Sequence, residues 1–426
     1  MKQFLRVKPG ALLLSVMSGM ASAQQFGGHI SASSGESDNA YKSETRLLTE
    51  RQDTYEVALA GDYTNQFLSG TAEYTGLDRR FAEHSQEDVR TLDGAASLML
   101  GAPTDPVDLQ LKHSRHTLLS APDEINVTTN QDEREIVSVI PRVKKRISAA
   151  DMVLASADFT QIDFTKNELN NSKRTTAALS WIRRASKVSN INLQAQQSDI
   201  KFDNFDSADY RYTNAVVVYS TQLRNLSYSL AVGYNRSERD SGDNYGSPTY
   251  AFSTSYKTPL HSFKLMSSKA ITDSSMGNGN VRGVNQNPDN DGAFKVDQIE
   301  RVNTEVSWGT QALCIKCTLS LSLHQNKDDY LLLPDEGRQE GGSASFTYSF
   351  TEDIKASYKA SDLRQRFVGS LIGRDYDYKT QRLELAIGIV ESFSFRVFME
   401  LEDRDSDDND RTYNEEFVGA ALSYAF

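Results

Sequence analysis

The stretch Phe417–Phe426, FVGAALSYAF, alternates strictly between large apolar and small residues. Every second residue back from the end is mostly large and apolar: Phe426, Tyr424, Leu422, Ala420 and Val418. Side chains alternate between two faces along a strand, so this stretch is a β-strand with one apolar face. A soluble sandwich or barrel shows the same pattern when that face is turned into a core. The stretch alone leaves both folds open.

The same alternation recurs upstream, and there the second face carries charge. It is clearest in residues 226–235, 315–323, 382–389 and 393–402. A soluble sandwich must bury its apolar faces against each other, whereas a lipid-embedded barrel exposes them to lipid and keeps charged faces in a watery lumen. We therefore predict an all-β fold, a transmembrane antiparallel up-and-down β-barrel. Its candidate lumen-lining residues are Glu56, Arg382, Glu384, Arg396 and Glu400.

Short turns and longer polar segments alternate along the chain. The short turns run from residues 61–66 to 390–393, and the longer polar segments run from 36–50 to 403–411. Outer-membrane barrels have short periplasmic turns and long extracellular loops. The pattern predicts about twenty strands, or about eighteen if the weak first strand near Gln25–Ser34 and one other segment fail. An even count places both ends of the sheet in the periplasm.

The first residues have the pattern of a secretory signal peptide. Basic residues between Lys2 and Lys8 precede the apolar run Ala11–Met17 and the small residues Ala21-Ser22-Ala23. This order of basic, apolar and small regions predicts a signal peptide over residues 1–23, and the barrel then occupies residues 24–426. We expect export to the outer membrane of a Gram-negative bacterium.

Composition narrows the possible partners. The mean hydropathy of -0.52 excludes a bundle of transmembrane helices but not a barrel, which exposes only every second residue to lipid. The formal net charge of -12 argues against nucleic acid. The expected partners are outer-membrane lipid, lipopolysaccharide and the barrel assembly machinery. Tyr424 and Phe426 are the candidate membrane-interface residues, and a final Phe resembles the signal read by that machinery.

Cys314 and Cys317 are the two cysteines of the chain. In an extended strand, residues three apart lie about 10 Å from each other, too far for a disulfide, but a β-turn brings them within bonding range. The pair falls at an expected periplasmic turn, and the periplasm is oxidising, so we predict a structural disulfide. Two free thiols, or a redox or metal role, are the alternatives.

No residue pattern indicates catalysis or a cofactor. In His113-Ser114-Arg115-His116, period 2 places His113 and Arg115 on one face and Ser114 and His116 on the other, which separates the adjacent nucleophile and base. Acid-rich loops such as Asp403–Asp410 lack the spacing of a calcium loop. We read them as solvated loops, with weak calcium binding or lipopolysaccharide bridging as the alternative. The expectation is a non-enzyme without metal or cofactor.

Three stretches share features with a known barrel family. Glu36-Ser37-Asp38-Asn39 ends an early strand, Thr49–Asp62 follows it, and Tyr219–Arg236 reads YSTQLRNLSYSLAVGYNR. They resemble, in turn, the threonine-aspartate-asparagine signature, the second strand and the repeated tyrosine–turn–strand–glycine-tyrosine unit of the outer-membrane barrels associated with exopolysaccharide export and PEP-CTERM (exosortase) systems. The chain departs from that family at Tyr256–His261, where members carry a tryptophan and a proline-arginine-threonine turn.

The resemblance implies a conduit or accessory pore through which exopolysaccharide crosses the outer membrane, with periplasmic export components as partners. One alternative is a general diffusion porin for small solutes. Its distinguishing feature would be a long loop folded into the lumen, for which Asp273–Lys295 is the obvious candidate. A second alternative is a barrel sheath around an electron-transfer cytochrome.

Overall fold

The structure is a computed structural model that describes residues 25–102, 104–239, 242, 244–276 and 296–426. The expected signal peptide lies outside the described residues, as does most of Asp273–Lys295. Where the chain is described, no helix is both long and apolar enough to cross a membrane.

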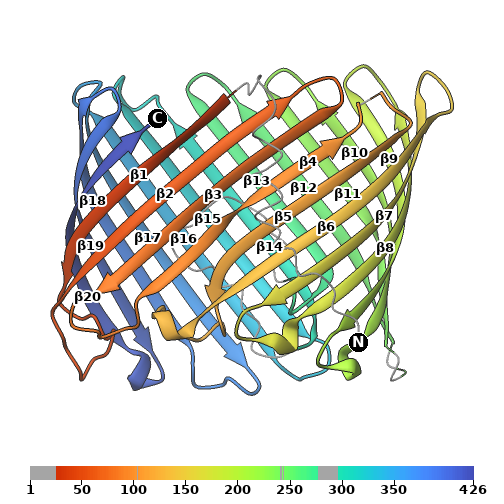
Figure 1. Cartoon of the computed structure of the whole chain (residues 1–426). Helices are drawn as coiled ribbons and strands as arrows, with labels where there is room; N and C mark the ends of the chain where they lie inside the picture. Colours follow the sequence, from red (N-terminus) through yellow and green to blue (C-terminus); the bar gives the residue numbers. More distant parts are fainter. Residues whose placement is uncertain (1–24, 103, 240–241, 243, 277–295) are drawn as a thin grey trace, which may run out of the picture.

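Twenty antiparallel strands within the described ranges form one closed sheet (Figure 1). The prediction of about twenty strands is confirmed, and the alternative of eighteen is wrong. The strands are β1 Gln25–Ser37, β2 Glu50–Thr64, β3 Leu68–Phe81, β4 Val89–Leu100, β5 Val107–Leu119, β6 Gln131–Arg146, β7 Asp151–Phe164, β8 Ser172–Arg184, β9 Ser189–Phe202, β10 Tyr210–Gln222, β11 Leu226–Arg239, β12 Asn244–Lys257, β13 His261–Asp273, β14 Gln298–Thr310, β15 Cys317–Tyr330, β16 Glu336–Ser349, β17 Ile354–Val368, β18 Tyr376–Val390, β19 Phe393–Ser406 and β20 Tyr413–Ala425.

The described helical structure consists of short 3-10 turns in the loops on one rim of the barrel. They are η1 Thr128–Asn130, η2 Glu168–Asn170, η3 Asp206–Ala208 and η4 Asn409–Arg411.

The first and last strands close the barrel. β1 pairs with β20 from His29 opposite Ala425 to Ser37 opposite Phe417. Beyond the pair of His29 and Ala425, the amide of Gly28 donates to the carbonyl of Phe426, and the amide of Phe426 donates to the carbonyl of Gly28, both at 3.0 Å. The weak alternation of β1 comes from its glycines. A larger residue does not fit at Gly35, because a Cβ atom there would lie 2.5 Å from the ring of Phe417. Glycine gives this ring the space that it occupies at the seam.

The outer face of the barrel is apolar, as the alternation of the strands predicts. Leu383 on β18 is 56% exposed, Leu422 on β20 is 48% exposed, and Phe426 is 49% exposed. A soluble fold would bury side chains of this size, since each gains about 1.5–3 kcal/mol on leaving water. Around a closed sheet they face lipid instead, with every strand hydrogen bond satisfied within the protein. The fold is therefore that of a transmembrane β-barrel.

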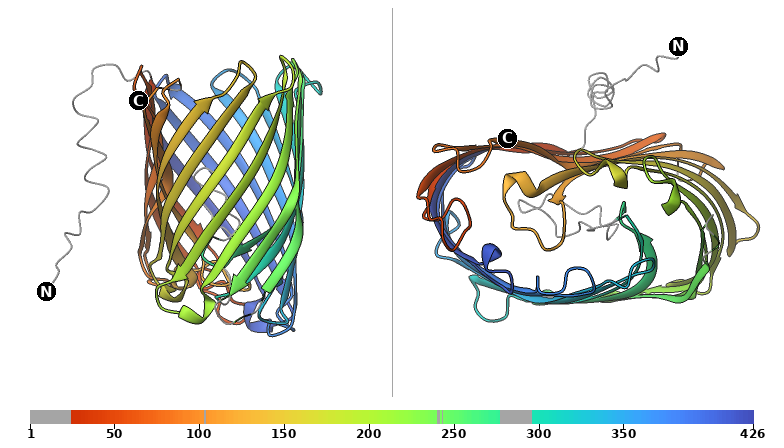
Figure 2. Two further views of the ribbon diagram at one scale, coloured as in Figure 1. Left: turned by 90° about the vertical axis from the view of Figure 1, so that its right-hand side faces the viewer. Right: turned by 90° about the horizontal axis from the view of Figure 1, so that it is seen from below.

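The two rims differ as expected. The turns at the periplasmic rim are short, such as residues 223–225 between β10 and β11 and residues 391–392 between β18 and β19. Longer loops, such as residues 38–49 and 120–130, join the strands at the other rim. Seen along its axis the barrel is flattened, so that the long wall containing β1–β5 faces the wall containing β15–β19 (Figure 2).

Candidate functional site in the barrel lumen

The loop of residues 120–130, between β5 and β6, leaves the rim and enters the lumen (Figure 2). We call it the inward loop. Asp123 near its tip is only 1% exposed, although it lies in a polar loop. A buried carboxylate is costly unless charges and hydrogen bonds compensate it, so its partners fix the position of the loop.

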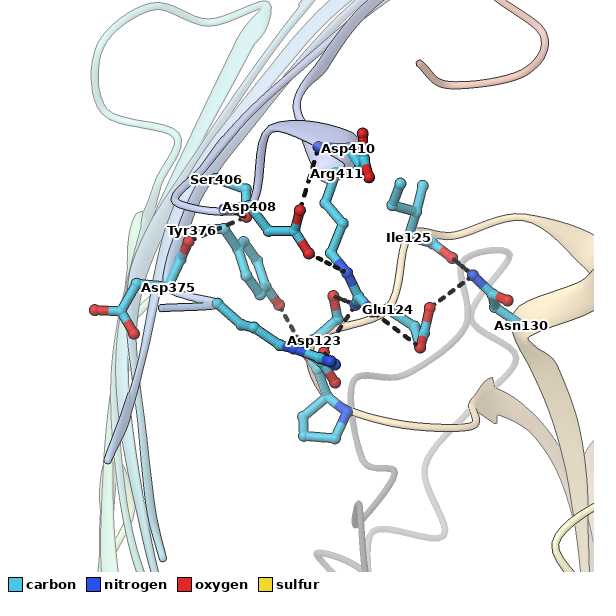
Figure 3. A network of polar contacts seen from close by, with 12 residues as sticks. Asp123, Glu124, Ile125, Asn130, Asp375, Tyr376, Ser406, Asp408, Asp410 and Arg411 are labelled. Carbon is cyan, nitrogen blue, oxygen red and sulfur yellow. Dashed lines mark hydrogen bonds and ion pairs between the residues drawn. The ribbon is translucent and has the colours of Figure 1, made fainter. Parts of the chain in front are cut away.

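Three arginines from the far side of the lumen bind Asp123, and Figure 3 labels one of them, Arg411. Arg374 and Arg411 place Nη1 atoms 2.7 and 2.8 Å from Oδ2 of Asp123. Arg404, on the inner face of β19, donates from Nη2 to the carbonyl of Asp123 at 2.6 Å. The hydrogen bond to Asp123 and the charge of that carboxylate raise the pKa of Arg374, which keeps the guanidinium charged.

Neighbouring groups complete this network, which joins the inward loop to β18, β19 and η4. The hydroxyl of Tyr376 donates to the carbonyl of Pro122 at 3.1 Å. The guanidinium of Arg404 lies 3.7 Å from the centre of the Tyr376 ring and also donates to the carbonyl of Glu124. Charge-assisted bonds of this kind are roughly twice as strong as neutral ones, so the loop is firmly held at its tip.

The base of the inward loop is held from its own side of the barrel. Gln86, between β3 and β4, accepts from the amide of Thr128 at 2.9 Å and donates to the carbonyl of Ala40 at 2.9 Å. Lys166, between β7 and β8, donates to the carbonyls of Thr128 and Thr129. The loop is therefore attached to both walls and lies across part of the lumen.

A second element enters the lumen at the junction of β13 and β14. Asp273 binds Arg174 of β8 and the hydroxyl of Tyr210 of β10, while Ser275 bonds Ser172 at 2.9 Å. Met276 packs against a buried apolar cluster on the inner faces of β5, β6 and β7, which consists of Leu118, Ile136, Ile162 and Phe164. These contacts lie across the lumen from β13.

Asp297, which directly precedes β14, is held by similar contacts. Asp297 accepts from Nη2 of Arg239 at 3.0 Å and from the amide of Leu332 at 3.0 Å. Burial raises the pKa of Asp297 above its ordinary value in spite of these donors. Asp273–Lys295 is the candidate inward-folding loop of the porin alternative, and its described residues Asp273–Met276 lie inside the barrel. The remainder lies outside the described residues.

A third inward contact comes from the loop between β1 and β2. Nζ of Lys42 lies 2.5 Å from Oε2 of Glu402 and 3.1 Å from Oε2 of Glu415. Burial alone would lower the pKa of Lys42, but Glu402, Tyr413 and Glu415 outweigh it, and the pKa is raised well above its ordinary value. Lys42 adopts a left-handed backbone conformation, with φ of 52°, which L-residues rarely do outside turns.

The predicted lumen residues all lie on inward-facing positions of their strands. Glu56 accepts from or donates to Nε2 of His29 at 2.7 Å, depending on protonation. Arg382 bridges Glu400 at 2.9 Å and Glu384 at 3.0 Å. Arg396 donates to the hydroxyl of Ser423 at 3.0 Å. Their contact with a passing solute stays a prediction.

The remaining candidate groups are the motif at residues 113–116 and the acidic run at residues 403–410. His113 lies on the outer face, where it bonds Glu135 at 2.9 Å, and Ser114 points to the inner face, so the two do not form a nucleophile–base pair. The described residues include no group of three or more His, Cys, Asp or Glu side chains that could hold a metal. In the acidic run, Asp408 caps η4 and binds Arg411 at 3.4 Å.

Cys314 and Cys317 lie at the periplasmic turn between β14 and β15. Their Cα atoms are 5.3 Å apart and the structure joins the two sulfurs. That separation is usual for disulfides, and it arises because the amide of Cys317 donates to the carbonyl of Cys314 across the turn. The redox state in the cell stays a prediction.

The inward loop was missed by the sequence analysis, which singled out only Asp273–Lys295. Ser120–Glu133 reads as an ordinary polar loop, and nothing local distinguishes Asp123 from a solvated carboxylate. The sequence does not point to its partners either, because Arg374, Arg404 and Arg411 stand among acidic residues that are much nearer to them in the chain.

The chain is similar to several solved structures but matches no protein family. No protein-family model matches the chain, and no curated protein matches its sequence. Among solved structures, the siderophore receptor PirA from Acinetobacter baumannii is 11% identical over 94% of this chain and 80% of that one, with a TM-score of 0.49.

Two further solved structures are similar at a comparable level of identity. The FrpB iron transporter from Neisseria meningitidis is 10% identical over 97% of this chain and 83% of that one, with a TM-score of 0.49. OccK2 (OpdF) from Pseudomonas aeruginosa is 10% identical over 95% and 98%, with a TM-score of 0.42.

Proposed function

We infer that this barrel is a diffusion channel for small hydrophilic solutes across the outer membrane. The observation that carries the proposal is the inward loop, which Asp123 anchors to Arg374, Arg404 and Arg411 on the other side of the lumen. A loop tied to both walls reduces the open cross-section permanently. The opening that remains favours solutes over polymers, and the polar, charged inner faces provide a wet path.

Two features suit passive passage rather than tight binding. Some inward-facing charges are paired with each other, as Arg382 is with Glu384 and Glu400, so these groups bind a passing solute only weakly. Transport along a concentration gradient needs no metal, and the described residues include no group of three or more His, Cys, Asp or Glu side chains that could hold one.

Export of exopolysaccharide, which the sequence resemblance implies, is the second proposal. A pore with charges of both signs would let a sugar polymer slide without sticking, but the anchored loops would have to leave the lumen first. The cytochrome sheath would need the lumen free of these loops to hold a folded partner, and the inward loop therefore counts against it.

Liposome swelling tests the proposal directly. Vesicles with the reconstituted protein should swell quickly in small sugars such as arabinose and progressively more slowly in larger oligosaccharides. Dextran should not enter. Rapid entry of dextran through the wild-type protein would overturn the diffusion-channel proposal and favour the polymer conduit, and vesicles impermeable to all of these solutes would overturn both.

A further inference from the structure

The flattened lumen carries opposite charges on facing walls in its periplasmic half. On β2 and β3, Asp62 and Glu73 point inward, and on β17 Lys355 and Lys359 point inward. β1–β4 and β17 lie on opposite long walls of the oval (Figure 2). None of these four side chains forms a hydrogen bond or ion pair with another described residue, so their charges act on the lumen.

The acidic wall contains a recess that is large enough for a small molecule. Asp62 and Glu73 line a recess of about 440 Å³ in the inner face, whose other inward residues include Gly27, Ala60 and Ala95. These small side chains leave the carboxylates accessible. Glu56 on β2 and Asp93 on β4 have the same sign, whereas Arg79 towards the other rim and Lys112 on the neighbouring β5 are inward cations.

The basic wall extends beyond β17. Lys257 of β12 and Lys264 of β13 also point inward, and Glu305 of β14 is the inward carboxylate among them. On the neighbouring β18 and β19, Arg382 bridges both Glu384 and Glu400, and with Arg396 these four inward charges cancel. The wall opposite Asp62 and Glu73 is therefore positive.

We propose that these walls form a selectivity region that favours small zwitterionic solutes, such as amino acids, over uncharged solutes of equal size. Two oppositely charged walls create a field across the pore, and a lumen with low-dielectric walls strengthens it. A zwitterion aligns its ammonium group towards Asp62 and Glu73 and its carboxylate towards Lys355 and Lys359. An uncharged solute gains nothing from the field.

The inference rests on the proposed diffusion channel, and one set of variants tests both. The first variant is Asp62→Asn with Glu73→Gln, and the second is Lys355→Gln with Lys359→Gln. A matched control changes two outward-facing charges, Glu416→Gln with Lys379→Gln. Each protein is reconstituted at full length into vesicles, where entry of L-serine is compared with entry of glycerol, and into planar bilayers, where the reversal potential is measured in a KCl gradient.

We expect both lumen variants to lower the serine-to-glycerol ratio by about threefold, because a field needs both walls. Their reversal potentials should move in opposite directions, towards anion preference for the first variant and cation preference for the second. The charge-swapped variant Asp62→Lys, Glu73→Lys, Lys355→Glu, Lys359→Glu should keep the serine preference because only the direction of the field changes.

The outcomes separate the two proposals. A wild-type channel that conducts, but whose serine-to-glycerol ratio is the same in all variants and the control, overturns the selectivity region and leaves the diffusion channel standing. A wild-type protein without conductance overturns the diffusion channel, and the selectivity region with it. A lumen variant that fails to fold will migrate on a gel at the same position before and after boiling. In that case the serine-to-glycerol ratio of the charge-swapped variant tests the selectivity region.

Discussion

Oδ2 of Asp123 and Nη1 of Arg374 lie 2.7 Å apart inside the barrel, although 251 positions separate the two residues in the chain. The strands between them are joined by sheet hydrogen bonds around the wall, whereas this contact runs across the lumen. It makes the inward loop part of the pore rather than of the outer surface. Pore size and barrel stability therefore depend on different interactions.

Replacing Asp123 with alanine should open the pore without unfolding the barrel. Removal of one partner from a buried ion pair costs about 3–5 kcal/mol, and here the loss falls on the docking of the loop. We expect larger and noisier single-channel conductance, together with faster entry of large oligosaccharides. The sheet hydrogen bonds are untouched, so the heat-modifiable gel shift should occur at a similar temperature.

Asp163→Ala provides the matched control, since this carboxylate lies at the same end of the barrel and accepts from Gln161 on β7. Its conductance should equal that of the wild type. If Asp123→Ala behaves like Asp163→Ala, the inward loop does not limit the pore.

The Lys42 site should make the extracellular end of the barrel sensitive to alkali. The pKa of Lys42 is raised in the folded protein, so its ion pairs contribute their full stability below the ordinary value of 10.5. That stability is lost as the pH rises from 10.5 through the higher folded pKa. We expect protease cleavage in residues 38–49 to accelerate over this range in the wild type.

Lys42→Met should remove most of this pH dependence and expose the same loop at neutral pH, because Glu402 and Glu415 then lack their cation. Arg46→Met is a suitable control, since Arg46 lies over the ring of Tyr41 and not in the acidic pocket. Equal cleavage of wild type and Lys42→Met at pH 8 would contradict this account.

The strands could be predicted because one face of each strand contacts lipid and must therefore be apolar. In β18, Leu383 and Leu385 must contact hydrocarbon, which leaves Arg382 and Glu384 for the inside, so period 2 alone places them. The turns could be predicted in the same way, because they are the short segments between the alternating stretches. Even the weak β1 was found, although its glycines obscure the pattern.

The lumen contacts could not be predicted in this way. Asp123 and Lys42 lie in loops where no periodicity applies, and their partners are set by the curvature and flattening of the closed sheet. Arg404 illustrates the difficulty: its inward orientation follows from the pattern of β19, but its binding of the Asp123 carbonyl depends on a loop from the other side of the barrel. Only the three-dimensional closure brings them together.

The cysteine pair should be oxidised in protein isolated from cells. We expect no reaction with a maleimide until a reductant is added, and then two labels per chain, at Cys314 and Cys317. A disulfide that closes so short a loop stabilises by only about 2 kcal/mol in the chain-entropy model. Cys314→Ser with Cys317→Ser should therefore still give a folded barrel, and labelling without reductant would contradict the disulfide.

Phe426→Ala should weaken assembly more than stability. The wild-type protein should migrate faster on a gel before boiling than after it, as a detergent-stable closed barrel does. The ring of Phe426 is 49% exposed, so its loss costs at most about 1–2 kcal/mol, and the backbone bonds between residues 426 and 28 are kept. The variant refolded in detergent should thus show the gel shift at nearly the wild-type temperature, whereas its yield in the outer membrane should fall severalfold. Val418→Ala, which shortens another outward apolar residue of β20, should leave that yield unchanged. Equal outer-membrane yields for Phe426→Ala and Val418→Ala would show that the assembly machinery does not read the final ring.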